Sequence, residues 1–449
     1  MHIHVPRLLV EQEGFQSKRQ EVKDGLALVV YLVASRTRDE DFVNLSHDFF
    51  GLYVRERSFP ALKRILLAWN ILECDGKYSA RSYKKKSFGY RMTEAAAMSG
   101  LSPYEISSAT ALRRFRQEAG KSRYRHCRLP VHRRLVDSLW TVSVDETAAN
   151  VAIGQLDGEA KYYSQVVVDS IVEKDFHWKP CPYDRVHSNI TRLKRELRRC
   201  LQFEGKCLFE ADIACSQPLM LAALLPEDVR RSEDGKFYSE LCQQGELHRF
   251  IQTSLNLADK DEAKDQLFKY LFGPPRRNLD ISKLFRETFS TIHAFVEATK
   301  TGTRFQHYKR LAQTMQRKEA GIVIQTICAE LYARFPTIEI LTVHDSLLTT
   351  EKYINEVVGV MRKIIYNTID IQPQIRVTPP QPPYERRFSP VGELCEATRS
   401  HRPTGVVRHC GCIRLDRAID TRCGPFSWLS GHTTAGVRKT GRGQRGCPC

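Results

Sequence analysis

A short segment that reads as a strand ending in a carboxylate constrains this chain more than any other feature. Apolar and polar side chains alternate over residues 206–214, which predicts a β-strand that ends near Asp212. An apolar helical run follows over residues 216–225, and Pro218 stands in its first turn, where a missing N–H is tolerated. The pattern puts Asp212 at a strand end beside a helix N-terminus, a favourable place to gather cations and phosphates.

A second carboxylate lies between two apolar segments of residues 338–350. These segments flank His344 and Asp345, which predicts two strands joined by a tight turn that presents Asp345 at a sheet edge. A helical segment over residues 354–369 is expected to cover the back of that sheet. Phosphoryl transfer to a hydroxyl requires charge neutralisation on the reacting oxygens, which two Mg²⁺ ions held by two such carboxylates provide. The alternative for either motif alone is an aspartate that only caps a helix or a turn.

Residues 259–273 form a strong helix signal between the two carboxylates. Asp259 is a good N-cap, Gly273 is a good stop, and the two prolines after it forbid continuation. Four side chains recur at every fourth position and share one face: Lys260, Lys264, Phe268 and Phe272. This face suits a nucleoside triphosphate, with phosphates on the lysines and the base on the rings. The alternative is an ordinary amphipathic helix with buried phenylalanines and solvated lysines.

Composition narrows the class of partner. The formal net charge of +17 favours a polyanion such as nucleic acid or an acidic membrane surface, against the alternative of a merely solvated basic surface. No run of about 18 apolar residues is present, which argues against a membrane span. The N-terminus lacks a basic stretch followed by a long apolar one, so we expect no secretory signal. The cysteines up to Cys328 stand singly, as free thiols do, and we expect a cytoplasmic protein.

The length of 449 residues allows two or three domains. Residues 20–95 predict a small, mostly helical domain in which two neighbouring helices precede a short hairpin with its turn at Asp75-Gly76. Lys84 and Lys85 belong to the basic stretch after that turn. Helix, helix and basic hairpin is the order of a winged helix-turn-helix module, whose wing contacts phosphate. The alternative is a helical subdomain with a solvated basic loop.

Three further regions follow. Residues 96–205 are expected to be helical, with a helix start at Ser102–Glu105. Residues 206–385 alternate strands and helices, as α+β domains do. Residues 386–449 lose all periodicity and predict a disordered basic tail. The tail's histidines and cysteines fit no well-attested zinc spacing, so an unstructured tail is preferred to a zinc site; they are His409, Cys410, Cys412, Cys423 and His432.

Taken together and in order, the three elements resemble motifs A, B and C of the A-family DNA polymerases and of the related phage-type single-subunit RNA polymerases. The matching segments are Asp212 with Ser216-Gln217, the helix from Lys260 to Gly273, and Val343-His344-Asp345-Ser346. The His-Asp-Ser form of the third motif is closer to the RNA polymerases. Two weaker matches, residues 185–193 and 315–319, resemble stretches that touch the primer–template. The resemblance covers about residues 180–370, with a softer likeness to polymerase-like proteins of bacteria and mobile elements.

The resemblance implies a right-hand architecture, in which residues 96–205 form a helical, thumb-like region that contacts the template and residues 206–385 form the palm sheet and the helical fingers. It implies that Asp212 and Asp345 bind two Mg²⁺ ions and that Lys264 holds the triphosphate. The other substrate-binding residues that it implies are Lys260, Phe268, Phe272, Gln217 and His344. The residues that it implies for nucleic acid are Arg185, Arg192 and Gln316, to which the predicted wing adds Lys84 and Lys85.

Three departures leave the choice between ribo- and deoxyribonucleotides open. Lys260 stands where the family usually has Arg, Leu219 where DNA polymerases carry a sugar-gating Glu, and Phe272 where Tyr is usual. We therefore expect a template-directed polymerase that binds nucleoside triphosphates, a DNA template and a primer or nascent strand, with no membrane partner. Two alternatives remain: a non-catalytic DNA-binding replication protein of a mobile element with a degenerate palm, and a winged-helix regulator with an unrelated C-terminal domain. Retention of both aspartates together with Lys264 favours the polymerase.

Overall fold

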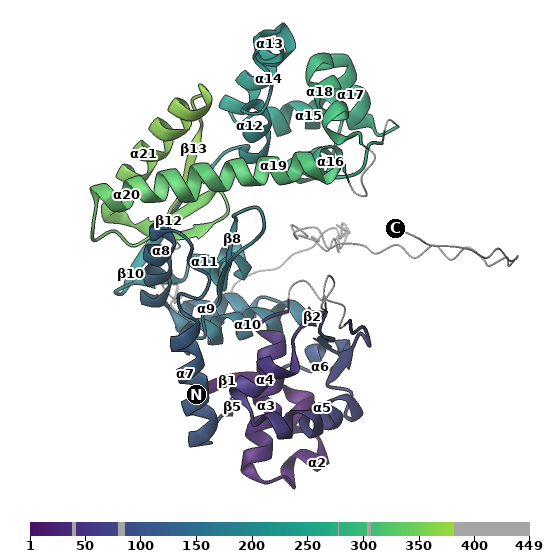
Figure 1. Cartoon of the computed structure of the whole chain (residues 1–449), viewed down its shortest axis with the longest axis vertical. Helices are drawn as coiled ribbons and strands as arrows, with labels where there is room; N and C mark the ends of the chain where they lie inside the picture. Colours follow the sequence, from purple (N-terminus) through teal and green to yellow (C-terminus); the bar gives the residue numbers. More distant parts are fainter. Residues whose placement is uncertain (38–41, 80–85, 277, 303–306, 381–449) are drawn as a thin grey trace, which may run out of the picture. The chain divides into compact units, whose positions relative to one another are not determined.

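The computed structural model of the chain describes residues 1–37, 42–79, 86–276, 278–302 and 307–380 (Figure 1). The fold over these ranges is α+β, as the sequence predicts. None of the helices in them is long and apolar enough to cross a membrane. Lys84, Lys85 and the tail from residue 386 onward, with its zinc candidates, lie outside the described residues.

Buried apolar side chains form two clusters within these ranges. One runs from Ile3 to Phe115 and also includes Tyr162 and Val166, and the other runs from Val131 to Ile375. Helix α10 (Gly158–Val172) contributes Val166 to the first cluster and Val167 to the second. A single helix therefore joins the two hydrophobic cores.

The first cluster is built from short elements. They are β1 (His2–Pro6), α1 (Arg7–Val10), α2 (Glu13–Gln16), α3 (Gln20–Ala34), β2 (Val43–Asn44), α4 (His47–Tyr53), the 3-10 turn η1 (Glu56–Ser58), α5 (Phe59–Ala68), β3 (Leu72–Cys74), β4 (Gly89–Met92), α6 (Glu94–Met98), β5 (Leu101–Glu105) and α7 (Ala109–Ser122). The two helices predicted before the hairpin are α4 and α5. Ser46 caps α4 by accepting a hydrogen bond from the Phe49 N–H.

The hairpin predicted over residues 71–78 is wrong. β3 pairs with β4, and β2 pairs with the other edge of β4, so the strand order is β2-β4-β3. The Asp75 carboxylate explains the longer connection, because it accepts hydrogen bonds from the N–H groups of Lys77 (3.0 Å) and Gly89 (2.8 Å) and from the Lys86 ammonium (2.9 Å). These bonds tie the two ends of the loop together without a tight two-residue turn.

The helix start predicted at Ser102–Glu105 is also wrong. These residues belong to β5, which pairs antiparallel with β1 in a two-stranded sheet, with His4 opposite Pro103. A proline is tolerated there because a two-stranded sheet leaves one edge of each strand unpaired. The next helix, α7, begins at Ala109, and the Ser108 side chain caps it.

The second cluster holds the longer elements. They are α8 (Pro130–Thr141), β6 (Val142–Val144), α9 (Glu146–Gly154), α10, β7 (Trp178–Pro180), β8 (Val186–Ser188), the 3-10 turn η2 (Ile190–Arg192), α11 (Arg195–Arg198), β9 (Leu201–Phe203), β10 (Lys206–Ile213), α12 (Ser216–Ala222), α13 (Glu227–Arg231), α14 (Glu233–Gln243), α15 (Leu247–Ser254), α16 (Lys260–Phe272), α17 (Asp280–Thr288), α18 (Ser290–Lys300), α19 (Lys309–Ala320), the π-helix η3 (Gly321–Cys328), α20 (Ala329–Arg334), β11 (Leu341–Val343), β12 (Ser346–Thr350), α21 (Glu351–Ile369) and β13 (Ile375–Thr378).

A six-stranded antiparallel sheet organises this cluster. Its order is β11-β12-β10-β9-β6, and β13 also pairs with β10. Alternation along β10 buries Ala211 and Ile213 on one face, which α21 covers, and leaves Glu210 and Asp212 on the other. The strand predicted to end near Asp212 and the helix predicted to cover the sheet are both confirmed.

The regular alternation of strands and helices predicted after Cys207 is wrong. Only helices, α12 to α20, occur between β10 and β11 in the described residues. The last three, α19, η3 and α20, follow one another as one continuous helical rod (Figure 1). This rod begins at Lys309, so residues 315–319 lie within its first helix, α19.

Candidate active site

The turn that carries Asp345 follows from the register of its hairpin. Val343 of β11 pairs with Ser346 of β12, so only His344 and Asp345 form the turn. A two-residue hairpin turn needs a positive φ at its first central residue, and His344 has φ 56°. The tight turn predicted from the sequence is confirmed.

Asp212 occupies the centre of a polar row across the sheet. It stands opposite Ser346 of β12 on one side and opposite Arg376 of β13 on the other, so all three side chains share one face. The Ser346 hydroxyl donates a 2.8 Å hydrogen bond to Asp212 Oδ1. Because Asp345 precedes Ser346, this register brings the two predicted carboxylates to the same edge of the sheet.

Both carboxylates are held in surroundings that disfavour negative charge. The pKa of Asp345 lies well above its usual range, chiefly because the group is removed from bulk water, and then because of the negative charges of Glu319 and Asp212. Burial also raises the pKa of Asp212, with Glu210 adding to the shift, while the Ser346 hydrogen bond and the positive charge of Arg376 oppose it. Both side chains keep partial exposure to solvent.

Glu319 is a third carboxylate beside this pair, and the sequence analysis missed it. It is 1% exposed and accepts from the Arg185 guanidinium at 2.6 Å, from the Ser216 hydroxyl at 2.9 Å and from the Gln217 amide. Arg185 and Gln217 were predicted as functional residues, whereas Gln316 lies half-buried one helical turn before Glu319. A glutamate followed by a long apolar run within a helix was the available signal.

Helix α16 has the bounds that the sequence predicts. The Asp259 side chain accepts from the Glu262 N–H at 2.8 Å, and the buried Lys300 ammonium donates to the Gly273 carbonyl at 3.0 Å near the other end. Burial lowers the pKa of Lys300 to about 8. The helix contacts α15 and α19, and both of its termini are therefore anchored.

The predicted face of α16 is not a core face. Phe268 and Phe272 are half-buried and their rings stack at 5.1 Å, with the Lys264 ammonium 5.7 Å from the Phe268 ring. The residues that α16 buries are others: Ala263, Leu267, Tyr270 and Leu271. The alternative that buries both phenylalanines in the core is therefore not observed, although Phe272 contacts its edge.

Three cations lie near one buried imidazole beside the first turn of α12. Burial lowers the pKa of His248 to about 4, and the positive charges of Lys264, Lys260 and Arg376 lower it further. His248 Nδ1 lies 3.2 Å from Cys215 Sγ, three residues after Asp212. His248 and Arg376 were missed because no local pattern in the sequence marks them.

Gly245 leaves the space that the Arg376 side chain occupies. It has φ +70°, and a Cβ built on it would lie 3.2 Å from the Arg376 guanidinium and 2.3 Å from the Gln374 amide oxygen. A side chain at this position would therefore displace Arg376 or strain the backbone.

Other predicted residues are found in different surroundings. Arg192 donates to the carbonyls of Ala34, Ser35 and Thr37 at the C-terminal end of α3, a capping arrangement between the two cores. Leu219 is fully buried, so its side chain is not open to a bound sugar. The His344 ring lies 5.9 Å from the ring of His187.

The chemistry of Asp212 and Asp345 fits Mg²⁺. Hard cations with bound waters need only one or two protein carboxylates. Among the described residues neither acid forms an ion pair, whereas Glu319 pairs with Arg185. Among the described residues, the one group of three ligand-type side chains close enough for a shared ion is the exposed set His47, Asp48 and Glu56 in the other core. That group needs no ion to explain it, because exposed carboxylates commonly bind none.

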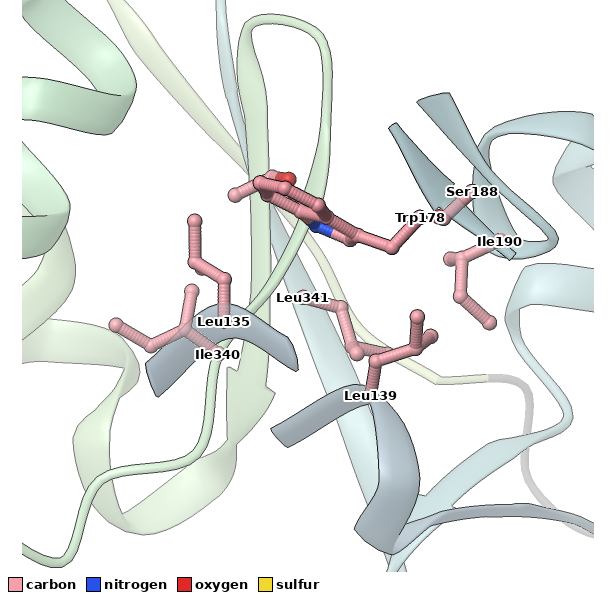
Figure 2. A pocket seen from close by; sticks show the side chains of 8 residues that line it. Leu135, Leu139, Trp178, Ser188, Ile190, Ile340 and Leu341 are labelled. Carbon is pink, nitrogen blue, oxygen red and sulfur yellow. The ribbon is translucent and has the colours of Figure 1, made fainter. Parts of the chain in front are cut away.

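A small internal void lies under the hairpin that carries Asp345 (Figure 2). Its volume is about 10 Å³, and Trp178, Leu341 and Thr342 are among the side chains that line it. A site for a small molecule typically needs some 300 Å³ or more. The void is therefore a packing feature.

Comparison with known proteins finds a likeness among solved structures, but none among family models or curated proteins. No protein-family model matches the chain, and no curated protein matches it. Among solved structures it is similar to the POL domain of Pol1 from M. smegmatis, determined in complex with a DNA primer-template and dNTP, with 13% sequence identity over 59% of this chain and 71% of that chain and a TM-score of 0.40.

Proposed function

We propose that this chain is a template-directed nucleic-acid polymerase. It would join a nucleoside monophosphate to a strand end: the terminal hydroxyl oxygen attacks the α-phosphorus of a nucleoside triphosphate, its proton is lost, and the bond to pyrophosphate breaks. The observation that carries the proposal is the pair Asp212 and Asp345 at one sheet edge, with Arg376 in the same row as Asp212 and the lysine face of α16 nearby.

Asp212 and Asp345 would hold two Mg²⁺ ions. Bound there, the ions supply charge neutralisation on the attacking and leaving oxygens. Ser346 orients Asp212 through its 2.8 Å hydrogen bond. The raised pKa of Asp345 supports this role, because a carboxylate crowded by other acids gains most from a cation.

Lys260, Lys264 and Arg376 would bind the triphosphate. Their charges all act on His248, which indicates that they lie around one locus, and the lowered pKa keeps that imidazole neutral at pH 7. Lysine offers a point charge, whereas arginine offers a fork that fits phosphate oxygens. The half-buried Phe268 and Phe272 would give the base a ring surface beside the lysines.

Glu319 would act as a positioning residue. Its contacts join Arg185 before β8, Ser216 of α12 and its own helix α19. The ion pair would hold the Arg185 guanidinium close to Asp345, where a strand end has to lie. Gln316, on the same helix and partly exposed, is a further candidate for contact with nucleic acid.

A nucleic-acid-binding role for the N-terminal domain is a second proposal. Its elements follow the order α3-β2-α4-α5-β3-β4, with the sheet order β2-β4-β3. A helix pair followed by a two-stranded wing supports the winged-helix interpretation, in which the second helix enters the major groove. Arg55 and Arg64 are exposed near and on that second helix, α5.

The main alternative is a DNA-binding replication protein with an inactive palm. A protein without catalysis has no chemical need to keep two carboxylates of raised pKa near a set of cations. The arrangement of Asp212, Asp345 and Lys264 therefore favours the enzyme.

The test is nucleotide incorporation on a primed DNA template with Mg²⁺, with dNTPs and NTPs supplied separately. We expect incorporation by the wild type and none by Asp212→Ala/Asp345→Ala, whose binding to the primer–template should persist. The matched control is Asp261→Ala/Asp265→Ala, two exposed acids on α16, which should retain activity. Absence of incorporation by a folded, DNA-binding wild type would favour the non-catalytic alternative.

A further inference from the structure

The chain between Arg113 and Arg134 is unusually basic. These 22 positions hold nine arginine or lysine residues and one acid, Glu118. They cover most of α7, the connection after it and the start of α8. Such a concentration of like charge repels itself unless a polyanion or internal carboxylates neutralise it.

Internal carboxylates neutralise only part of this charge. Arg123 pairs with Asp137 at 2.7 Å and Arg125 pairs with Glu118 at 2.8 Å. Arg128 and Arg133 are exposed, and within the described ranges neither forms an ion pair with a carboxylate. Arg128 and Arg133 are therefore among the cations left for a partner.

The connection between α7 and α8 contacts the β7–β8 hairpin. The ring of His132 on α8 lies 4.9 Å from the ring of Trp178 on β7, and the Arg128 N–H donates to His132 at 3.2 Å. Lys179, which follows Trp178, is exposed and likewise lacks a carboxylate partner among the described residues. We call Arg125, Arg128, Arg133 and Lys179 the basic cluster.

Electrostatics supports the same grouping. The pKa of His126 is lowered first by burial and then by the positive charges of Lys179, Arg125 and Arg128. Arg133 lies 6.0 Å from the centre of the Tyr124 ring, and that ring is 42% exposed. An exposed aromatic ring among cations is a surface on which a base can stack.

The hairpin leads from the basic cluster to the carboxylates. Lys179 pairs directly with His187 across the two strands, so their side chains share one face. The His187 ring lies 5.9 Å from the His344 ring, and His344 precedes Asp345. At the turn of the hairpin, the Arg317 guanidinium lies 6.0 Å from the Tyr183 ring and Arg185 pairs with Glu319. Cations and imidazoles therefore extend from the cluster to Asp345.

We propose that the basic cluster binds the sugar–phosphate backbone of a nucleic-acid strand whose end lies at Asp345. The position of the strand end rests on the proposed polymerase function; the contact with phosphates does not. The continuity of the cluster with the carboxylate site favours nucleic acid over an acidic membrane, because a flat bilayer surface has no reason to follow a hairpin into that site.

The test compares two triple variants of equal charge change. Arg128→Ala/Arg133→Ala/Lys179→Ala removes the unpaired cations of the cluster, whereas Lys352→Ala/Arg362→Ala/Lys363→Ala removes three exposed cations from α21, which covers the opposite face of the sheet. Binding of a fluorescent primer–template duplex is measured across a range of KCl concentrations. Each lost phosphate contact should reduce the slope of log K against log salt by about 0.9. We expect the cluster variant to bind about tenfold or more weakly with a slope smaller by 2 to 3, and the α21 variant to bind as the wild type does.

Three further comparisons decide whether the basic cluster binds phosphates. Arg128→Lys/Arg133→Lys should restore most of the binding, which separates a charge effect from misfolding. Vesicles of phosphatidylserine should not distinguish the cluster variant from the α21 variant; a loss confined to vesicles, with duplex binding intact, would overturn the proposal. Equal slopes for the wild type and the cluster variant on the duplex would overturn it as well.

Primer length separates this inference from the proposed function. With long primers the cluster variant should incorporate poorly at limiting DNA, and this defect should vanish when the duplex is too short to reach from Asp345 to the cluster. An incorporation defect that does not depend on primer length would mean that the strand does not run from Asp345 to the basic cluster. A wild type that binds through the cluster but never incorporates would leave the phosphate contact in place and defeat the polymerase assignment.

Discussion

Aspartates of the two hydrophobic cores differ in how many hydrogen-bond partners they have. Asp24, on α3, accepts from Tyr104 (2.8 Å), from Gln20 (2.8 Å) and from the Ser108 N–H (2.7 Å). In the main sheet, Asp212 accepts from one side chain, and within the described ranges Asp345 accepts from no other residue. Buried charge is normally paired or hydrogen-bonded, so an acid left without such partners indicates a site kept for a ligand.

Asp175 is the second aspartate of the fully partnered kind. It accepts two hydrogen bonds from the Arg36 guanidinium, at 2.8 and 3.0 Å, and one from the Tyr31 hydroxyl at 3.2 Å. Because Asp175 follows α10 and Arg36 follows α3, the pair connects the two cores. The comparison separates these fully partnered acids from Asp212 and Asp345, which is why only the latter two are proposed as metal ligands.

The largest effect is expected from Asp345→Asn. The variant loses the charge that would bind Mg²⁺, so incorporation should fall by about 10³-fold or more. It also loses a charge that the fold disfavours, so the melting temperature of the metal-free protein should rise or stay the same. Primer extension and thermal unfolding in EDTA measure both. A large loss of stability would show that Asp345 is a structural acid like Asp175 and would break the comparison.

A smaller effect, on stability and not on incorporation, is expected from Asp175→Asn. Its removal leaves the buried Arg36 unpaired, which should lower the free energy of unfolding by about 3 kcal/mol. Incorporation per folded molecule should remain close to that of the wild type. Urea unfolding followed by circular dichroism measures the change. Arg36→Met/Asp175→Leu is the matched control, and it should recover part of the loss because neither partner is left alone.

The smallest effect is a dependence of stability on pH. Its sign is opposite to that of an acid whose pKa is lowered by folding. The folded-state pKa of Asp345 is raised, so the folded protein holds its proton to a higher pH than the unfolded chain does. The metal-free protein should therefore gain stability at this group as pH falls through the folded pKa. Protons also compete with Mg²⁺ there, so the apparent dissociation constant for Mg²⁺ should increase by up to about tenfold per pH unit below that pKa.

Titration of Mg²⁺ between pH 5 and 8 with the wild type and Asp345→Asn measures this effect. A flat response in the wild type would mean that Asp345 does not bind the ion. Asp75, whose pKa is lowered by its hydrogen bonds in spite of burial, provides the internal contrast. Its contribution to stability is present above the unfolded pKa and is lost as pH falls.

Local patterns in the sequence predicted the parts of the site that local physics determines. The bounds of α16 follow from the Asp259 cap and the prolines after Gly273, and the turn at Asp345 follows from two apolar strands that leave two residues between them. Each depends on residues within a few positions of one another. The α+β class and the strand that ends near Asp212 were predicted for the same reason.

Residues that reach the site through long-range pairing were not predicted. Arg376 enters the row of Asp212 only through the register of β13, 164 positions further along the chain. Glu319 enters through the packing of α19 against α12, and His248 through its contact with Cys215. The prediction for Ser102–Glu105 failed for a different reason. Its serine and proline resemble a helix start, but pairing with β1 makes the segment a strand.

The two-residue turn at His344 and Asp345 limits how this site can change during evolution. Val343 and Ser346 pair directly, so inserting one residue would either break the hairpin or move every later side chain of β12 to the other face of the sheet. Ser346 would then leave Asp212, and Leu347 would leave the interior. Change at the turn is therefore confined to substitution, and a library for directed evolution should keep its length while varying the identity of His344.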